Sequence, residues 1–116
     1  MKPDDLKWSA MEGMPGAQMA VVYGNPAAAG TYTLRLKLAP GTKFPAHWHP
    51  SAERVTILSG TFLVGVGDKM DVSHMQALPA GSFVYLPAGF HHYAMAKTAV
   101  VLQSTGMGPF KMNVVK

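Results

Sequence analysis

Apolar and polar residues alternate along several short stretches of the chain, most clearly between residues 31 and 38. Tyr32, Leu34, Leu36 and Leu38 share one parity, whereas the intervening positions carry two threonines, an arginine and a lysine. Because successive side chains of a β-strand point to opposite faces of the sheet, this pattern predicts a half-buried strand. Further strands are expected at residues 19–23, 53–58, 61–66, 82–86, 98–105 and 110–115.

The segments between these strands are rich in turn-forming residues, and no segment has a sustained helical period. Many short strands separated by Gly and Pro are typical of an all-β jelly roll or barrel. Residues 1–18 are expected to form an irregular N-terminal arm anchored by Trp8, followed by a single domain over residues 19–116. Residues 72–78 fit either a strand or a loop.

Two histidines, His47 and His49, stand two positions apart in a stretch that is expected to be extended. Their side chains then leave the same face of the strand, and Glu53 follows after Pro50 and Ser51, which favour a bend. Two imidazoles and a carboxylate from adjacent strands form half of a transition-metal site. A surface hairpin with two solvated histidines is the alternative that these residues alone leave open.

The spacing of glycines and ligand-type residues around this stretch carries a family resemblance. Five residues separate Gly41 from His47-x-His49, three more precede Glu53, and six more precede Gly60. This pattern resembles the first sequence motif of the cupins.

A second stretch resembles the second cupin motif. Five residues separate Gly81 from Pro87-x-Gly89, and two residues precede His92. The chain departs from the family at Ala96, where cupins often have an asparagine that does not bind the metal. The resemblance implies the cupin fold, a double-stranded β-helix or jelly-roll barrel.

The resemblance also implies one divalent transition metal per chain, with His47, His49, Glu53 and His92 as ligands. Three nitrogens and one oxygen suit Fe, Mn, Ni, Cu or Zn, and the sequence does not choose among them. On an ion that accepts six ligands, two neighbouring positions remain for water, dioxygen or a chelating substrate, as in a catalytic metal site.

Two further histidines are weaker candidates. The spacing from Gly89 selects His92 rather than His91 as the metal ligand. Adjacent residues of a strand point to opposite faces, so only one of the two can face the metal. His91 is therefore expected to face outward, either partly solvated or supporting a neighbouring ligand. His74 lies in the segment without a clear pattern and is expected in a surface loop.

Alternation along the strands also predicts which side chains line a pocket beside the metal. Two alanines that follow His92 on the inward face leave room for an organic ligand. Val55 and Ile57 share a face with Glu53 and form the opposite wall. The pattern does not decide whether Gln103 faces inward or outward. The candidate pocket residues are Val55, Ile57, Ala94, Ala96 and Gln103.

Composition narrows the range of partners. The net charge of +4 comes from lysines scattered along the chain, without the cluster expected of a nucleic-acid-binding surface. The chain has no cysteine, which excludes disulfides and thiolate metal sites. No apolar run approaches the roughly 18 residues of a membrane span, and the N-terminus lacks the apolar region of a signal peptide, so we expect a cytoplasmic protein. We also expect a homodimer that buries Trp8 and an edge strand.

These features together predict a small metallo-cupin that acts on a small organic molecule. The favoured hypothesis is a metal-dependent oxidoreductase of the dioxygenase type, with an oxygen-chelating substrate such as a diketone, a hydroxy-ketone or a phenol. The alternatives are an isomerase or lyase that works through a metal-bound enolate, and a non-catalytic cupin that senses a metal or small ligand. No general base beyond metal-bound water is evident, so no catalytic residue is assigned, and the fold alone does not decide among these functions.

Overall fold

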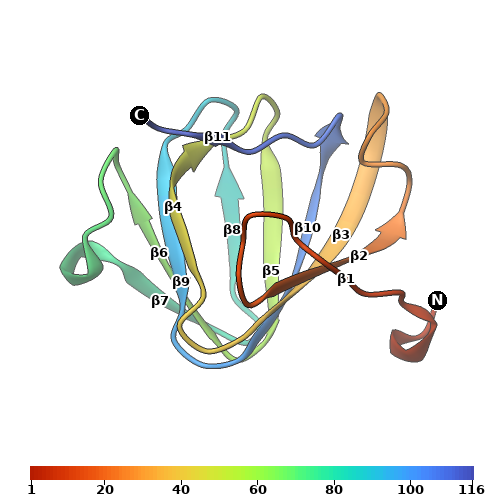
Figure 1. Ribbon diagram of the computed structural model, residues 1–116, viewed down its shortest axis with the longest axis horizontal. Coiled ribbons are helices and arrows are strands. Elements are labelled where there is room, and N and C mark those ends of the chain that lie inside the picture. Colours follow the sequence, from red (N-terminus) through yellow and green to blue (C-terminus); the bar gives the residue numbers. More distant parts are fainter.

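Two antiparallel β-sheets face each other across the hydrophobic core in a computed structural model that describes all residues, 1–116 (Figure 1). The first sheet has six strands in the order β1 (Ser9–Ala10), β2 (Ala17–Tyr23), β3 (Gly30–Leu38), β10 (Val100–Gly108), β5 (Glu53–Ser59) and β8 (Phe83–Leu86). The second has five strands in the order β11 (Asn113–Val114), β4 (Lys43–Trp48), β9 (His92–Ala96), β6 (Thr61–Val66) and β7 (Gln76–Pro79).

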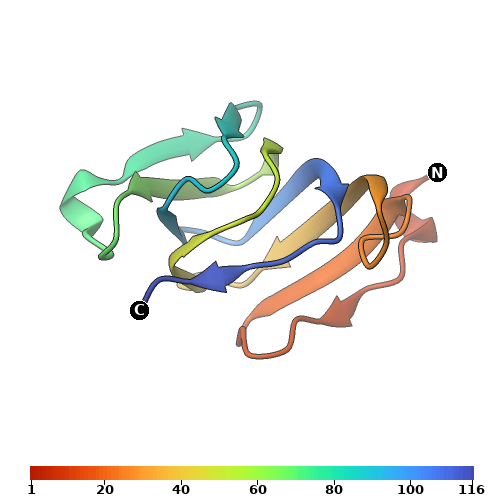
Figure 2. The same ribbon diagram turned by 90° about the horizontal axis from the view of Figure 1, so that it is seen from above.

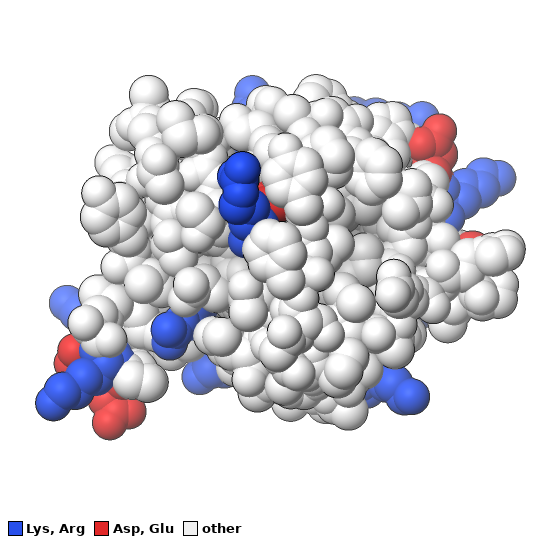
Figure 3. Space-filling view, turned by 180° about the vertical axis from the view of Figure 1, so that it is seen from behind, with Lys and Arg blue, Asp and Glu red and all other residues white.

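Only two short helical turns accompany the sheets, η1 (Pro3–Asp5) and η2 (Val72–His74). No helix of the protein is long and apolar enough to cross a membrane. Seen from above, the N-terminal strands β1 and β2 lie at one end of the molecule, and β6 and β7 lie at the other (Figure 2). From behind, Lys and Arg side chains are dispersed over the visible face rather than gathered in one patch (Figure 3).

The all-β jelly-roll fold expected from the sequence is confirmed, and the core lies between the two sheets. In β3, Tyr32, Leu34 and Leu38 are buried and Leu36 is half-buried, as the alternating pattern predicts. The central strand β10 pairs with both β3 and β5, and its Leu102 joins the core cluster. Burial of one face of each sheet therefore explains the period-two pattern along the chain.

Three segments differ from the sequence expectation in length or type. β10 continues to Gly108, beyond the expected end at residue 105, because its ladder with β3 extends through glycines that weaken the sequence signal for a strand. The expected strand at 110–115 is reduced to β11, which pairs with only two residues of β4. Residues 72–78, open in the sequence, form η2 and most of β7.

Gly60 lies where the chain passes from the six-stranded sheet to the five-stranded sheet, between β5 and β6. Its φ of 81° is in the left-handed region, and a Cβ atom there would overlap the backbone carbonyl of Ala99. Glycine is the residue that meets both conditions without strain. The other motif glycines, Gly41, Gly81 and Gly89, also have positive φ, so the two motifs mark turns that the fold requires.

Ala96 replaces the asparagine common in cupins without leaving an unpaired polar group. Its side chain is fully buried, its N–H donates to the Thr42 carbonyl at 2.9 Å, and its carbonyl accepts from Gly41 N–H at 2.8 Å. No buried side-chain nitrogen or oxygen in the protein lacks a hydrogen-bond partner. The backbone alone therefore satisfies this junction between β9 and the start of β4.

The N-terminal segment is tied to the core by Met14 and Ala17, both buried members of the core cluster. Trp8, the expected anchor, is only half-buried, and its ring lies 4.4 Å from the Lys37 ammonium in a cation–π contact. The strand β2 begins at Ala17, two residues before the expected start. The division into an arm over residues 1–18 and a domain over residues 19–116 stays a prediction.

We expect Met14→Ala to destabilise the protein more than Trp8→Ala. Truncation of a buried methionine typically lowers the free energy of unfolding by about 2–5 kcal/mol. Loss of an exposed cation–π contact costs about 0.5–1 kcal/mol. Urea unfolding of the two variants measures the difference, and a larger loss in Trp8→Ala would show that Trp8 holds the segment in place.

Candidate metal centre

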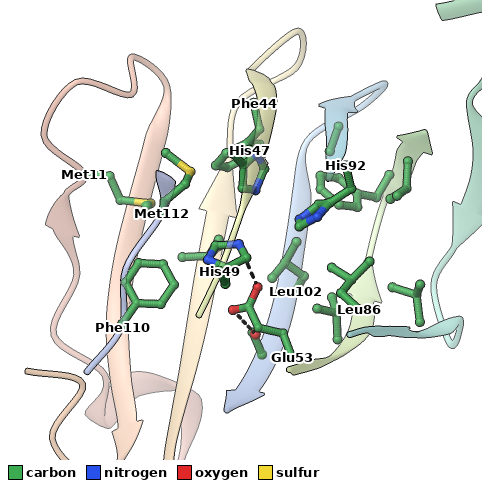
Figure 4. A pocket seen from close by; sticks show the side chains of 17 residues that line it. Met11, Phe44, His47, His49, Glu53, Leu86, His92, Leu102, Phe110 and Met112 are labelled. Carbon is green, nitrogen blue, oxygen red and sulfur yellow. Dashed lines mark hydrogen bonds and ion pairs between the residues drawn. The ribbon is translucent and has the colours of Figure 1, made fainter. Parts of the chain in front are cut away.

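Three buried histidines converge at one end of the space between the sheets (Figure 4). His47 lies on β4 and faces His92 of β9 across the antiparallel ladder, and His49 follows directly after β4. The centroid of the His47 ring is 4.2 Å from that of His92 and 4.9 Å from that of His49. One ring nitrogen from each histidine lies within 4.8 Å of the other two. The His-x-His spacing thus places both rings on one face, as strand geometry requires.

Each of these rings is held by a hydrogen bond from Nδ1 to a backbone carbonyl. The partners are Pro45 O for His47 at 2.6 Å, Lys111 O for His49 at 2.7 Å and Phe90 O for His92 at 2.9 Å. A carbonyl oxygen only accepts, so Nδ1 carries the proton and donates in all three rings. This leaves Nε2 of each ring for a second partner, the arrangement that is typical of metal-binding histidines.

Glu53 reaches this group from β5, in the opposite sheet. Its Oε1 lies 3.0 Å from Nε2 of His49, and its Oε2 accepts a hydrogen bond from the Ser104 hydroxyl at 3.0 Å. Burial by itself raises the pKa of Glu53, but the hydrogen bonds and charge of its partners hold the pKa below its ordinary value. Glu53 is therefore an ionised carboxylate inside an apolar shell.

The three imidazoles differ in protonation because their neighbours differ. Burial, helped by His92, lowers the pKa of His47 to about 4. Burial likewise lowers the pKa of His92. For His49, burial also disfavours the charge, but the contact with Glu53 outweighs it and raises the pKa. Two imidazoles whose neutral form is favoured thus stand beside His49, whose charged form is favoured by the Glu53 carboxylate.

This donor set fits a transition metal on chemical grounds. Two neutral Nε2 lone pairs need no deprotonation, and a cation at Nε2 of His49 would replace the proton that His49 shares with Glu53. Imidazole nitrogen with one carboxylate suits the divalent first-row metals, whereas Mg and Ca prefer sites built from oxygen alone. The three-histidine group can therefore hold a metal ion, with the Glu53 carboxylate beside it.

The two remaining histidines lie outside this group. His91 Nδ1 is 2.6 Å from Asp68 Oδ1, and His74 Nδ1 is 2.6 Å from Asp71 Oδ2, both in partly or largely exposed pairs. His91 faces away from its neighbour His92, as expected for adjacent residues of an extended chain. It contacts an aspartate rather than one of the candidate ligands, so it gives them no direct support.

A cavity of about 60 Å³ adjoins the histidines, and 12 of its 17 lining residues are hydrophobic. Of the pocket residues expected from the sequence, Val55 and Ala94 line it. Ile57 and Ala96 are instead packed in the core cluster, almost without exposed surface. Gln103, a candidate pocket residue whose orientation the pattern left open, lies on the outer face of β10 and not in the pocket, and its Oε1 accepts a hydrogen bond from Arg35 Nε at 3.0 Å. Its neighbours on the strand point inward, so alternation sends Gln103 outward.

Sequence reasoning missed 11 of the 17 residues that line the pocket, and four of these bear on the site: Ser104, Met11, Phe110 and Met112. Ser104 shares the inward parity of β10 with Leu102, a signal that was present in the alternation. Met11 lies in the N-terminal segment, which shows no strand pattern, whereas Phe110 and Met112 share one parity of the strand expected at 110–115, of which only β11 forms. The C-terminal segment matters doubly, because its Lys111 carbonyl also orients His49.

The fold and sequence are similar to those of known cupins. Residues 1–111 match the family model of the ChrR cupin-like domain. Germin-like protein 3-1 of Oryza sativa subsp. japonica is 39% identical over 80 residues, which cover 65% of this chain and 36% of that protein. The chain thus spans about a third of the length of this curated relative.

Two solved structures illustrate how widely the fold is shared. The polyketide cyclase RemF from Streptomyces resistomycificus superposes with a TM-score of 0.84 at 14% identity, over all of this chain and 84% of RemF. The oxalate decarboxylase of Lactobacillus farciminis superposes with a TM-score of 0.73 at 20% identity, over 99% of this chain and 35% of the enzyme. At these identities the likeness shows the fold, and the family model that covers residues 1–111 shows that the chain belongs to the ChrR cupin-like domain family of the cupin superfamily.

Proposed function

We propose that this protein is a metal-dependent enzyme of the cupin type that acts on a small organic molecule. The observation that carries the proposal is the set of three buried histidines whose Nδ1 atoms donate to backbone carbonyls. Their Nε2 atoms are left to face one another at the edge of an apolar cavity. A packed structural core would gain nothing from three buried imidazoles, because each costs desolvation free energy.

The proposed ligands are His47, His49, His92 and Glu53, for one divalent transition metal among Fe, Mn, Ni, Cu and Zn. When bound, the metal supplies Lewis-acid chemistry to a substrate oxygen. The protein's own part is to lock the three rings through the carbonyls and to keep a carboxylate charged in a site with little water. The low-dielectric surroundings strengthen the attraction between that carboxylate and a cation.

Of the possible reactions, we favour oxidation of the dioxygenase type. Isomerase or lyase chemistry is the second choice. Similar structures include an oxalate decarboxylase and a polyketide cyclase, so the shared fold serves more than one kind of carbon chemistry. A non-catalytic ligand sensor remains the alternative, since Glu53 is the only buried carboxylate in the pocket lining. If Glu53 binds the metal, no separate general base is left beside the substrate.

We also propose that the protein forms a homodimer in the cytoplasm. β1 is an edge strand of the six-stranded sheet, and Trp8 directly precedes it. The opposite edge strand, β8, exposes Phe83 and Tyr85 on its surface. Unpaired edges of this kind are commonly covered by a second copy of the same chain.

We expect purified protein to bind close to one transition-metal ion per chain and to lose it in His92→Ala. Loss of an outer partner of a ligand already costs about 10–100-fold in metal affinity, so removal of a ligand should cost at least as much. His91→Ala is the matched control and should leave the affinity unchanged, because its ring pairs with Asp68. Metal titration followed by elemental analysis measures both, and the reverse order would refute the assignment of His92.

Metal binding should release protons and should strengthen as the pH rises. His49 has a raised pKa, so below that pKa its proton must leave before Nε2 can bind. The pKa of His47 is lowered to about 4, so His47 does not compete near neutral pH. Above the pKa of His49 the affinity should level off. Calorimetry in buffers of different ionisation enthalpy counts the protons, and proton-free binding throughout would contradict the His49–Glu53 exchange.

The enzyme proposal is tested by loading the protein with each metal and offering it phenols, diketones and hydroxy-ketones. Dioxygenase chemistry should consume oxygen in the metal-loaded protein and should disappear in His92→Ala. Product formation without oxygen uptake would instead assign isomerase or lyase chemistry. Binding of these compounds without turnover, for every metal that the protein holds, would favour the sensor.

A further inference from the structure

All the polar side chains that line the cavity are either proposed metal ligands or hydrogen-bonded to one. They are His47, His49, Glu53, His92 and Ser104, and the Ser104 hydroxyl donates to Glu53. The other 12 lining residues are hydrophobic, so the lining contains no lysine, arginine, asparagine or glutamine. No side chain is therefore free to pair with a polar group of the ligand that lies away from the metal.

We propose, on the basis of the metal-dependent function above, that this site takes an uncharged molecule with an apolar, single-ring or alkyl body and one oxygen-chelating group. A dicarboxylate, a sugar or a phosphorylated compound would bury a second polar or charged group without a partner. Burial of an unpaired polar group costs binding free energy, and an unpaired charge costs far more. The pocket is thus expected to bind chelators with an apolar body more tightly than chelators with a second polar or charged group.

Aromatic rings flank the histidines and favour a flat ligand. The Phe110 ring centroid is 5.6 Å from that of His49, with an angle of 33° between the planes. The Phe44 ring centroid is 6.2 Å from that of His47 and 6.4 Å from that of Phe62. A ring bound beside the metal could pack against these aromatic side chains, which favour offset-stacked or edge-to-face contacts.

The size of the cavity indicates how such a ligand enters. Its volume is about 60 Å³, whereas an apolar cavity that admits benzene measures roughly 150 Å³. Met11 and Met112, which line the cavity, are half-buried, unbranched and flexible, so their side chains can shift to make room for a ring. In Figure 4 they lie beside Phe110, on the opposite side of the histidines from Leu86. The two chain ends therefore form the adaptable wall of the pocket.

The test compares two ligands that share one chelating group in the metal-loaded protein. Benzohydroxamate and acetohydroxamate differ only in a phenyl and a methyl group, and burial of the ring should make benzohydroxamate bind about tenfold more tightly or better. Oxalate, a chelator without an apolar body, should bind more weakly than benzohydroxamate. Equal affinities for the two hydroxamates, or a preference for oxalate, would overturn the proposal. This comparison uses the unmodified protein and does not depend on a variant that folds.

A matched pair of variants locates the effect in this cavity. Val84→Phe adds a ring to the lining and should lower benzohydroxamate affinity more than acetohydroxamate affinity, with metal content unchanged. Val21→Phe makes the same change at an exposed position of β2 and should alter neither. If both variants leave the two affinities unchanged, the ring does not bind in this cavity.

A separate measurement of metal content distinguishes failure of the proposed ligand class from failure of the proposed metal centre. A protein that binds metal but shows no preference for the apolar ligand contradicts the ligand class alone. A protein that binds no metal contradicts the metal centre, and the ligand class that rests on it falls too.

Discussion

The backbone carbonyls that orient the three histidines are the constraint on which the site depends. Two of them, on Pro45 and Phe90, lie two residues before the ring they hold, so the local backbone sets each tautomer. The third, on Lys111, comes from the far end of the chain and fixes His49. Without these acceptors a buried imidazole could present either nitrogen to the cavity, and the three Nε2 atoms would not converge.

The two-sheet architecture makes this convergence possible. The ladder between β4 and β9 places His47 opposite His92, and the Gly89 N–H donates to the His49 carbonyl at 2.9 Å, which ties the turn of the second motif to the first. Glu53 arrives from the facing sheet and meets His49 across the core. The opposite pKa shifts in the site, lowered for His47 and His92 and raised for His49, follow from burial and from this contact between sheets.

The apolar shell has two consequences that depend on the same residues. It lowers the local dielectric constant, so the His49–Glu53 attraction is strong and the neutral forms of His47 and His92 are favoured. It also removes every polar contact that a ligand could use except those at the centre itself. Electrostatics and ligand selection are thus linked, because both result from the hydrophobic side chains that the sheets turn inward.

The sequence by itself determined the all-β class and the candidate ligands, because strand alternation and motif spacing are local properties that neighbouring residues express. It also indicated that His91 and His92 face opposite ways, since adjacent residues of an extended chain must. Only the tertiary structure decided the outward position of Gln103, the deeper burial of Ile57 and Ala96, and the role of Met14 rather than Trp8 in the core. These depend on which strands become neighbours and on how far their ladders extend. The contributions of Lys111, Phe110 and Met112 depend on the return of the C-terminal segment to the histidines. This return brings His49 and Lys111, which are 62 positions apart in the sequence, into contact, and no local pattern encodes it.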